Sequence, residues 1–161
     1  MGESGAGKTT LAVYFSELPG AFVISEDIVL INYKENKVAT VKRPMFVRQN
    51  SYDVLREEHN IKINAEYSEL CDRYVYLPKH LSHGKDYKID LITVIQRQSE
   101  GAQMVLIEEP VESLVRNSFL YNNIAHNIYS SFKIAENNRV YSLKYSTLKL
   151  TEKLLNNNYG G

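Results

Sequence analysis

The feature that most constrains this chain is a glycine-rich motif at residues 2–9. The segment reads Gly-Glu-Ser-Gly-Ala-Gly-Lys-Thr, which matches the full pattern G-x-x-x-x-G-K-S/T. Glycines let the backbone turn tightly, so that successive N–H groups point inward at phosphate oxygens. A lysine and a hydroxyl at the last two positions suit the β- and γ-phosphates and Mg²⁺. The residues expected to bind the phosphates are Gly2, Ser4, Gly5, Ala6, Gly7, Lys8, Thr9 and Thr10.

The residues after the motif provide the context that such a loop requires. Apolar residues recur at helical spacing after Thr10, and Pro19-Gly20 ends the pattern. We expect a helix over residues 7–18, whose positive dipole end lies beneath the same phosphates. Lys8 would bridge the β- and γ-phosphates, and Thr9 would be a ligand of Mg²⁺. The sequence therefore predicts ATP with Mg²⁺ as the cofactor.

A loop of this kind normally connects a strand to a helix, and Met1 alone cannot form the strand before Gly2. Three explanations stay open: the gene start is placed too late, the chain is a degenerate remnant, or another segment supplies the strand. A loop without this support would have to become ordered on binding, and the entropy cost would weaken its affinity. Nucleotide binding without catalysis is therefore one alternative function.

Length and charge exclude several classes of protein. The 161 residues suit one domain, and a hydrophobic share of 43% supports a packed core rather than disorder. Lys plus Arg and Asp plus Glu both number 19, so no positive field is left to drive binding to nucleic acid or to an anionic membrane. No apolar run approaches the roughly 20 residues that cross a bilayer. The single cysteine, Cys71, cannot form an internal disulfide, which fits a cytoplasmic setting.

The order of apolar patterns predicts an α/β fold with a mixed, partly antiparallel sheet in one domain, residues 1–161. Short runs rich in β-branched and aromatic residues alternate with helical patterns along the chain. The last forty or so residues give only weak strand and helix signals. Strands are expected near 21–24, 28–31, 38–41, 73–77, 89–95 and 104–107, and helices near 7–18, 51–59 and 111–121.

One interpretation of the motif is a subunit of an ATP-binding cassette ATPase. Residues 104–110, Met-Val-Leu-Ile-Glu-Glu-Pro, resemble a cassette Walker B segment, with Glu108 where Asp is usual and Glu109 as the catalytic carboxylate. Residues 81–85 distantly resemble the signature loop, although its second glycine is absent. In this interpretation Gln49 takes the place of the glutamine in the glutamine loop, and His126 takes the place of the switch histidine. A cassette needs a helix where residues 89–95 predict a strand, so this interpretation ranks third.

A second interpretation starts from residues 22–31, Phe-Val-Ile-Ser-Glu-Asp-Ile-Val-Leu-Ile. Here the chain resembles the HPr kinase/phosphorylase-related family, in which a P-loop and a short helix precede a strand with two adjacent acids. Glu26-Asp27 occupies that position. Residues 41–48, which end in Arg48, and residues 110–114 resemble further family segments. The resemblance implies a phosphoenolpyruvate-carboxykinase-like P-loop fold, without the N-terminal domain of true HPr kinases.

The resemblance also implies an activity and residue roles. It implies phosphorylation of a Ser or Thr hydroxyl on a small protein or peptide, with Asp27 as general base and Glu26 near Mg²⁺. Because adjacent residues of a strand point to opposite faces, we expect one of the two acids, Asp27, to face the nucleotide. Arg48 is the first choice to stabilise the transferring charge, and Lys8 completes the expected catalytic set. The expected partners are a nucleoside triphosphate and a protein or peptide acceptor; association with a second copy of the chain stays open.

Overall fold

The computed structural model describes residues 1–24, 28–39, 43–78, 86–118 and 123–159, and it is a mixed α/β structure with three small sheets. The chain divides into two compact units. The first comprises Met1–Ala6, Ile31–Val38 and Tyr87–Gly161, and the second comprises Gly7–Leu30 and Ala39–Asp86. A search of the described ranges finds no helix of the length and hydropathy that a membrane crossing requires.

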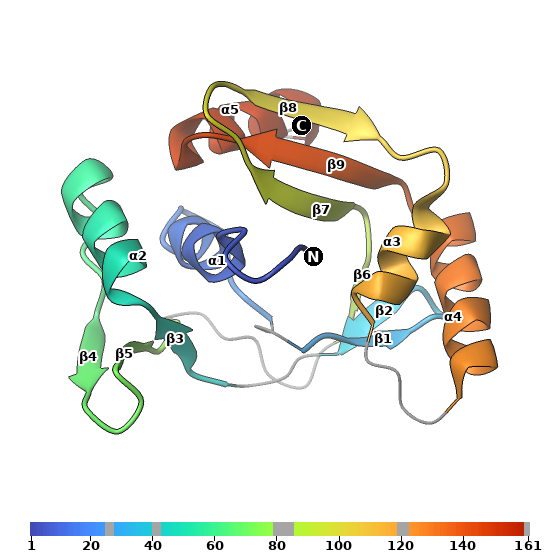
Figure 1. Ribbon diagram of the computed structural model, residues 1–161, viewed down its shortest axis with the longest axis horizontal. Helices are drawn as coiled ribbons and strands as arrows, with labels where there is room; N and C mark the ends of the chain where they lie inside the picture. Colours follow the sequence, from blue (N-terminus) through green and yellow to red (C-terminus); the bar gives the residue numbers. More distant parts are fainter. Residues whose placement is uncertain (25–27, 40–42, 79–85, 119–122, 160–161) are drawn as a thin grey trace. The chain divides into compact units, whose positions relative to one another are not determined.

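The first unit is built on a three-stranded sheet, which Figure 1 shows with α5 beside it. The strands are β7 (Ile92–Arg97), β9 (Val140–Tyr145) and β8 (Ala102–Leu106), in the order β7-β9-β8. The central strand β9 runs parallel to β7 and antiparallel to β8. This mixed pairing agrees with the mixed sheet that the sequence predicts.

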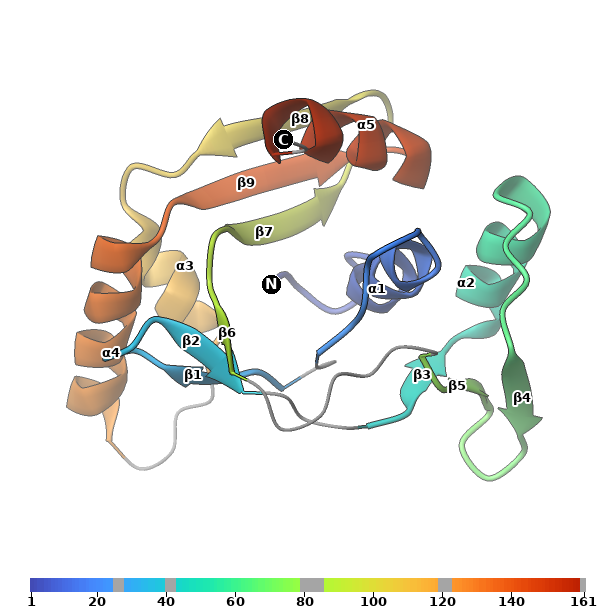
Figure 2. The same cartoon turned by 180° about the vertical axis from the view of Figure 1, so that it is seen from behind.

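The core of the first unit lies between this sheet and α5 (Leu148–Tyr159), which packs on β8 and β9 (Figure 2). In β9, Val140, Leu143 and Tyr145 are fully buried. Leu148 and Thr151 of α5 are also fully buried, and the Thr151 hydroxyl donates to the carbonyl of Thr147. That bond satisfies a polar group that burial would otherwise leave unpaired.

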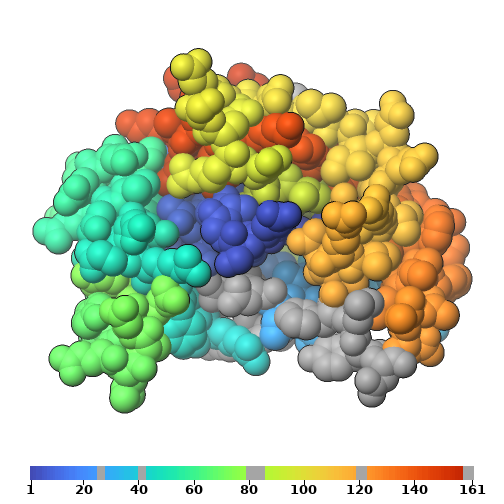
Figure 3. All heavy atoms as spheres, viewed as in Figure 1, coloured from blue at the N-terminus to red at the C-terminus, as the bar shows by residue number. Residues whose placement is uncertain are grey.

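Two helices, α3 (Pro110–Arg116) and α4 (Ile124–Asn137), pack against each other in the first unit. Proline suits the first position of α3 because that N–H has no partner inside a helix. The side chain of Asn123 caps α4 by accepting the N–H of His126 at 3.0 Å. Figure 3 shows α4 in orange at the surface, where its apolar side chains Ile128 and Phe132 are exposed.

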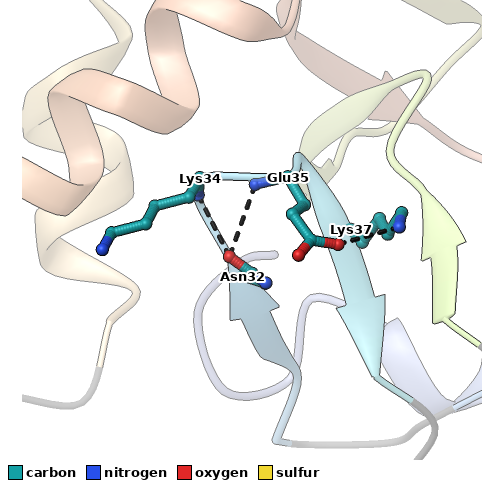
Figure 4. A network of polar contacts seen from close by, with 4 residues as sticks. All are labelled: Asn32, Lys34, Glu35 and Lys37. Carbon is teal, nitrogen blue, oxygen red and sulfur yellow. Dashed lines mark hydrogen bonds and ion pairs between the residues drawn. The ribbon is translucent and has the colours of Figure 1, made fainter.

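A second small sheet contains β1 (Leu30–Asn32), β2 (Lys37–Ala39) and β6 (Asp86–Lys88) in the order β1-β2-β6. Polar contacts close the turn between β1 and β2 (Figure 4). The Asn32 carboxamide oxygen accepts the backbone N–H groups of Lys34 and Glu35 at 3.2 and 3.4 Å. Lys37 lies 2.8 Å from the Glu35 carboxylate, and its hydrogen bond lowers the pKa of Glu35.

The second unit combines α1 (Lys8–Ser16), α2 (Gln49–Asp53) and the π-helical turn η1 (Val54–Glu58) with a third sheet. Its strands are β3 (Met45–Val47), β5 (Arg73–Tyr76) and β4 (Ala65–Ser68), antiparallel in the order β3-β5-β4. Helix α1 packs against β3. Among the described residues of this unit, the largest fully buried side chains are those of Val13, Met45, Val47, Leu55 and Tyr76.

A buried polar network joins α1 to β5. The hydroxyl of Tyr76 lies 2.9 Å from the Ser16 hydroxyl and donates to the carboxylate of Glu17. The Ser16 hydroxyl also lies 2.8 Å from the carbonyl of Val13. Burial and the bond to Glu17 raise the pKa of Tyr76 to about 12. The network therefore holds a neutral phenol between helix and strand.

Candidate phosphate-binding loop

The backbone that enters the glycine-rich loop pairs with the edge of β7. The amino group of Met1 donates to the carbonyl of Thr93 at 2.7 Å, and the N–H of Ile95 donates to the carbonyl of Met1 at 2.8 Å. Two such bonds to residues on either side of Val94 are the pattern of parallel pairing. The residue before the loop thus has the strand-like support that phosphate-binding loops use.

Gly2 lies where only a glycine fits. Its φ is 152°, a region that is essentially restricted to glycine. A Cβ at this position would lie 2.6 Å from the carbonyl oxygen of Ile95. The Gly2 N–H donates to the side-chain oxygen of Asn117, at the end of α3, at 3.2 Å. Sheet and helix therefore fix the start of the loop from two sides.

The middle of the loop is a tight turn that reaches the surface. The N–H of Ala6 donates to the carbonyl of Glu3 at 3.2 Å, and Glu3, Ser4 and Gly5 are exposed. The carbonyl of Ala6 accepts the hydroxyl of Tyr145, on β9, at 2.9 Å. The turn is thus tied to the sheet of the first unit by Met1 before it and by Ala6 at its end, and its tip faces solvent.

The loop leads directly into α1. Gly7 is the N-cap residue, with φ 87° and ψ 19°, and its carbonyl accepts the N–H of Leu11 at 2.9 Å. No side chain caps this helix, and its first turn contains no acidic residue. A helix whose own first turn contains no carboxylate is suited to an anion at its start, because the dipole leaves partial positive charge there.

The expected binding residues differ in where their side chains lie. Lys8 and Thr9 are half-buried in the first turn of α1. Thr10 is buried, and its hydroxyl donates to the hydroxyl of Ser51 at 2.9 Å. The Thr10 hydroxyl thus links α1 to α2.

The remaining expected residues lie apart from the loop or outside the described ranges. Glu26 and Asp27, the expected acid pair, fall outside the described residues, as do residues 81–85 of the cassette interpretation. Arg48 is exposed and is the N-cap residue of α2. Gln49 donates to the carboxylate of Asp53 within the same helix. No cluster of three His, Cys, Asp or Glu side chains that could hold a metal occurs in the described part of the chain.

The sheet topology separates Glu108 and Glu109 from the loop. Both are exposed and follow β8, which runs antiparallel to β9, whereas Met1 enters the loop parallel to β7 and β9. The end of β8 pairs near Tyr141 at the start of β9, and Tyr145, which contacts the loop, lies at the other end. A Walker B carboxylate would have to lie beside the loop, so this topology does not support the cassette interpretation.

Two residues of the site were not found from the sequence, Asn117 and Tyr145. Asn117 follows α3 with no motif around it, and Tyr145 is one of 12 tyrosines. Burial raises the pKa of Tyr145, so its hydroxyl remains a hydrogen-bond donor at neutral pH. Both act on the loop through contacts between residues far apart in the sequence, which a local pattern cannot reveal.

Comparison of the chain with protein-family models, curated protein sequences and solved structures finds no significant match.

Proposed function

We propose that residues 2–9 bind the phosphates of ATP with Mg²⁺, and that the chain is a phosphotransferase of the phosphoenolpyruvate-carboxykinase-like P-loop type. The observation that carries this proposal is the conformation of the motif. Its first glycine lies against β7, its last glycine is the N-cap residue of α1, and the first turn of α1 contains no acidic residue of its own. These are the features that make such a loop bind a polyphosphate.

The acceptor that we propose is a Ser or Thr hydroxyl on a small protein or peptide. When bound, ATP with Mg²⁺ supplies an activated phosphoryl group. The acceptor oxygen forms a bond to the γ-phosphorus while the bond from that phosphorus to the bridging oxygen breaks, and ADP leaves. Asp27 accepts the acceptor's proton. Lys8 and Arg48 offset the charge on the transferring group, and Thr9 and Glu26 are the residues proposed to hold the metal.

Binding is tested by titrating Mg·ATP while the unfolding of the protein is measured. A ligand that binds only the folded state stabilises it by about 2.7 kcal/mol at a concentration one hundred times its Kd. We expect this stabilisation in the wild type and its loss in Lys8→Ala. Lys34→Ala, which removes an exposed lysine in the turn between β1 and β2, is the matched control and should behave as the wild type. Absence of any stabilisation in the wild type would refute nucleotide binding.

Transfer is tested with γ-labelled ATP and a panel of Ser- and Thr-containing peptides. We expect label on a peptide, and its loss in Asp27→Asn. Glu26→Gln, a neighbouring change of the same kind, separates the role of general base from that of metal ligand, because more Mg²⁺ should restore its activity. Nucleotide binding without transfer to any acceptor would favour the non-catalytic alternative. Transfer that persists in Asp27→Asn would contradict the assigned base.

A further inference from the structure

We propose that Tyr145 is a positioning residue for the loop, because its hydroxyl fixes the Ala6–Gly7 peptide so that the Gly7 N–H points to the phosphate side. This inference rests on the proposed nucleotide-binding function and adds a residue outside the motif. It begins from one contact, the 2.9 Å hydrogen bond from the Tyr145 hydroxyl to the carbonyl oxygen of Ala6.

The tyrosine itself is held rigidly. Tyr145 is fully buried at the end of β9, the central strand, where it pairs with Arg97 of β7 and Ala102 of β8. Its carbonyl accepts the N–H of Gln98 at 2.9 Å. The guanidinium of Arg97 lies 5.0 Å from the centre of its ring. Because these neighbours hold the Tyr145 side chain in place, it cannot move with the loop. The Ala6 carbonyl must therefore adopt the position that a hydrogen bond to the Tyr145 hydroxyl requires.

Because the Ala6–Gly7 peptide unit is planar, fixing its carbonyl also fixes the direction of its N–H bond. The described residues contain no cis peptide bond, and in a planar trans peptide the C=O and N–H bonds point in opposite directions. Because the Ala6 carbonyl points at the Tyr145 hydroxyl, the N–H of Gly7 points away from that hydroxyl. The structure gives this N–H no acceptor among the described residues, whereas the N–H groups of Gly2 and Ala6 are both bonded. The Gly7 amide is the donor that we propose a bound phosphate uses.

The variant Tyr145→Phe tests the inference because it removes one oxygen and keeps the ring in the core. Tyr76→Phe is the matched control: Tyr76 is also fully buried, and its hydroxyl is bonded to Ser16 and Glu17 within the second unit. We expect Mg·ATP to bind Tyr145→Phe roughly five- to tenfold more weakly than the wild type, the loss of about one hydrogen bond. Tyr76→Phe should lower stability without changing the affinity.

A second measurement needs no nucleotide. In the free protein, the amide resonance of Gly7 should move and broaden in Tyr145→Phe and stay in place in Tyr76→Phe, because only the first change releases the Ala6–Gly7 peptide. If the wild type binds Mg·ATP and Tyr145→Phe binds it equally well, the inference is overturned. If the wild type fails to bind, the proposed function falls, and the Gly7 resonance alone decides whether Tyr145 orients the loop.

Discussion

Replacing Gly2 by alanine should detach the start of the loop from β7 rather than unfold the whole chain. Alanine at φ 152° is strained by about 1–3 kcal/mol. Its Cβ would also lie 2.6 Å from the Ile95 carbonyl oxygen, and that atom belongs to a paired strand that cannot shift at low cost. Detachment of the start of the loop from β7 would relieve both the backbone strain and this close contact.

The free energy lost when Met1 and Gly2 detach from β7 and Asn117 sets an upper limit on the loss of stability. Detachment gives up the two backbone bonds between Met1 and β7 and the bond from Gly2 to Asn117. At about 0.5–1.5 kcal/mol for each bond, the limit is of the order of 1.5–4.5 kcal/mol. Because chain entropy recovered by the freed residues offsets part of this loss, we expect Gly2→Ala to destabilise by about 1–3 kcal/mol.

Hydrogen exchange locates the change. In Gly2→Ala the N–H of Ile95, which donates to Met1, should lose protection, while the N–H of Gln98, which donates to Tyr145, keeps it. Gly5→Ala is the control: its φ is 85°, but no atom lies within 4 Å of the added Cβ, so it carries backbone strain alone. Unchanged protection at Ile95 in Gly2→Ala, or equal loss in Gly5→Ala, would refute the reasoning.

Two further predictions concern the cores of the two units. Leu143→Ala, at a fully buried position of β9, should lower the free energy of unfolding in urea by about 2–5 kcal/mol. Leu106→Ala, at a position of β8 that is 52% exposed, should lower it by about 0.5 kcal/mol or less. Equal losses would contradict the assigned core. Folding raises the pKa of Tyr76 from 10.0 to about 12, so the unfolded chain loses the phenol proton at a lower pH than the folded protein does. The stabilisation of the folded state by the protonated phenol is therefore complete below pH 10 and declines from pH 10 to 12. Tyr76→Phe should therefore be less stable than the wild type at pH 8, with a gap that narrows by pH 11; a gap that widens would reverse the assigned sign.

The sequence predicts best where the signal is local. The helix expected over residues 7–18 is α1 (Lys8–Ser16), since its apolar spacing and Pro19-Gly20 both lie within one segment. The strand expected at 73–77 is β5, which ends before Pro78 as a missing N–H donor requires. The strand expected at 89–95 begins later, at Ile92, because the N–H of Ile89 bonds instead to Asn36.

The sequence fails where long-range pairing decides the structure. Strand β9 is central to its sheet, yet Ser142 and Lys144 interrupt its apolar residues, so no clear run predicts it. Its burial comes from β7, β8 and α5, which lie on both sides of it in the sequence. For the site, the motif identifies the loop, and only the fold reveals its two anchors.

The anchors of the loop also determine when it can form during synthesis. Met1 pairs with a residue 92 positions later, and Ala6 is held by a tyrosine 139 positions later. Residues 1–6 thus acquire their final conformation only after the residues that pair with them have been made, since closing such long intervals is slow. During synthesis, residues 2–6 therefore lack the anchor from Tyr145 until the chain through that residue has emerged from the ribosome.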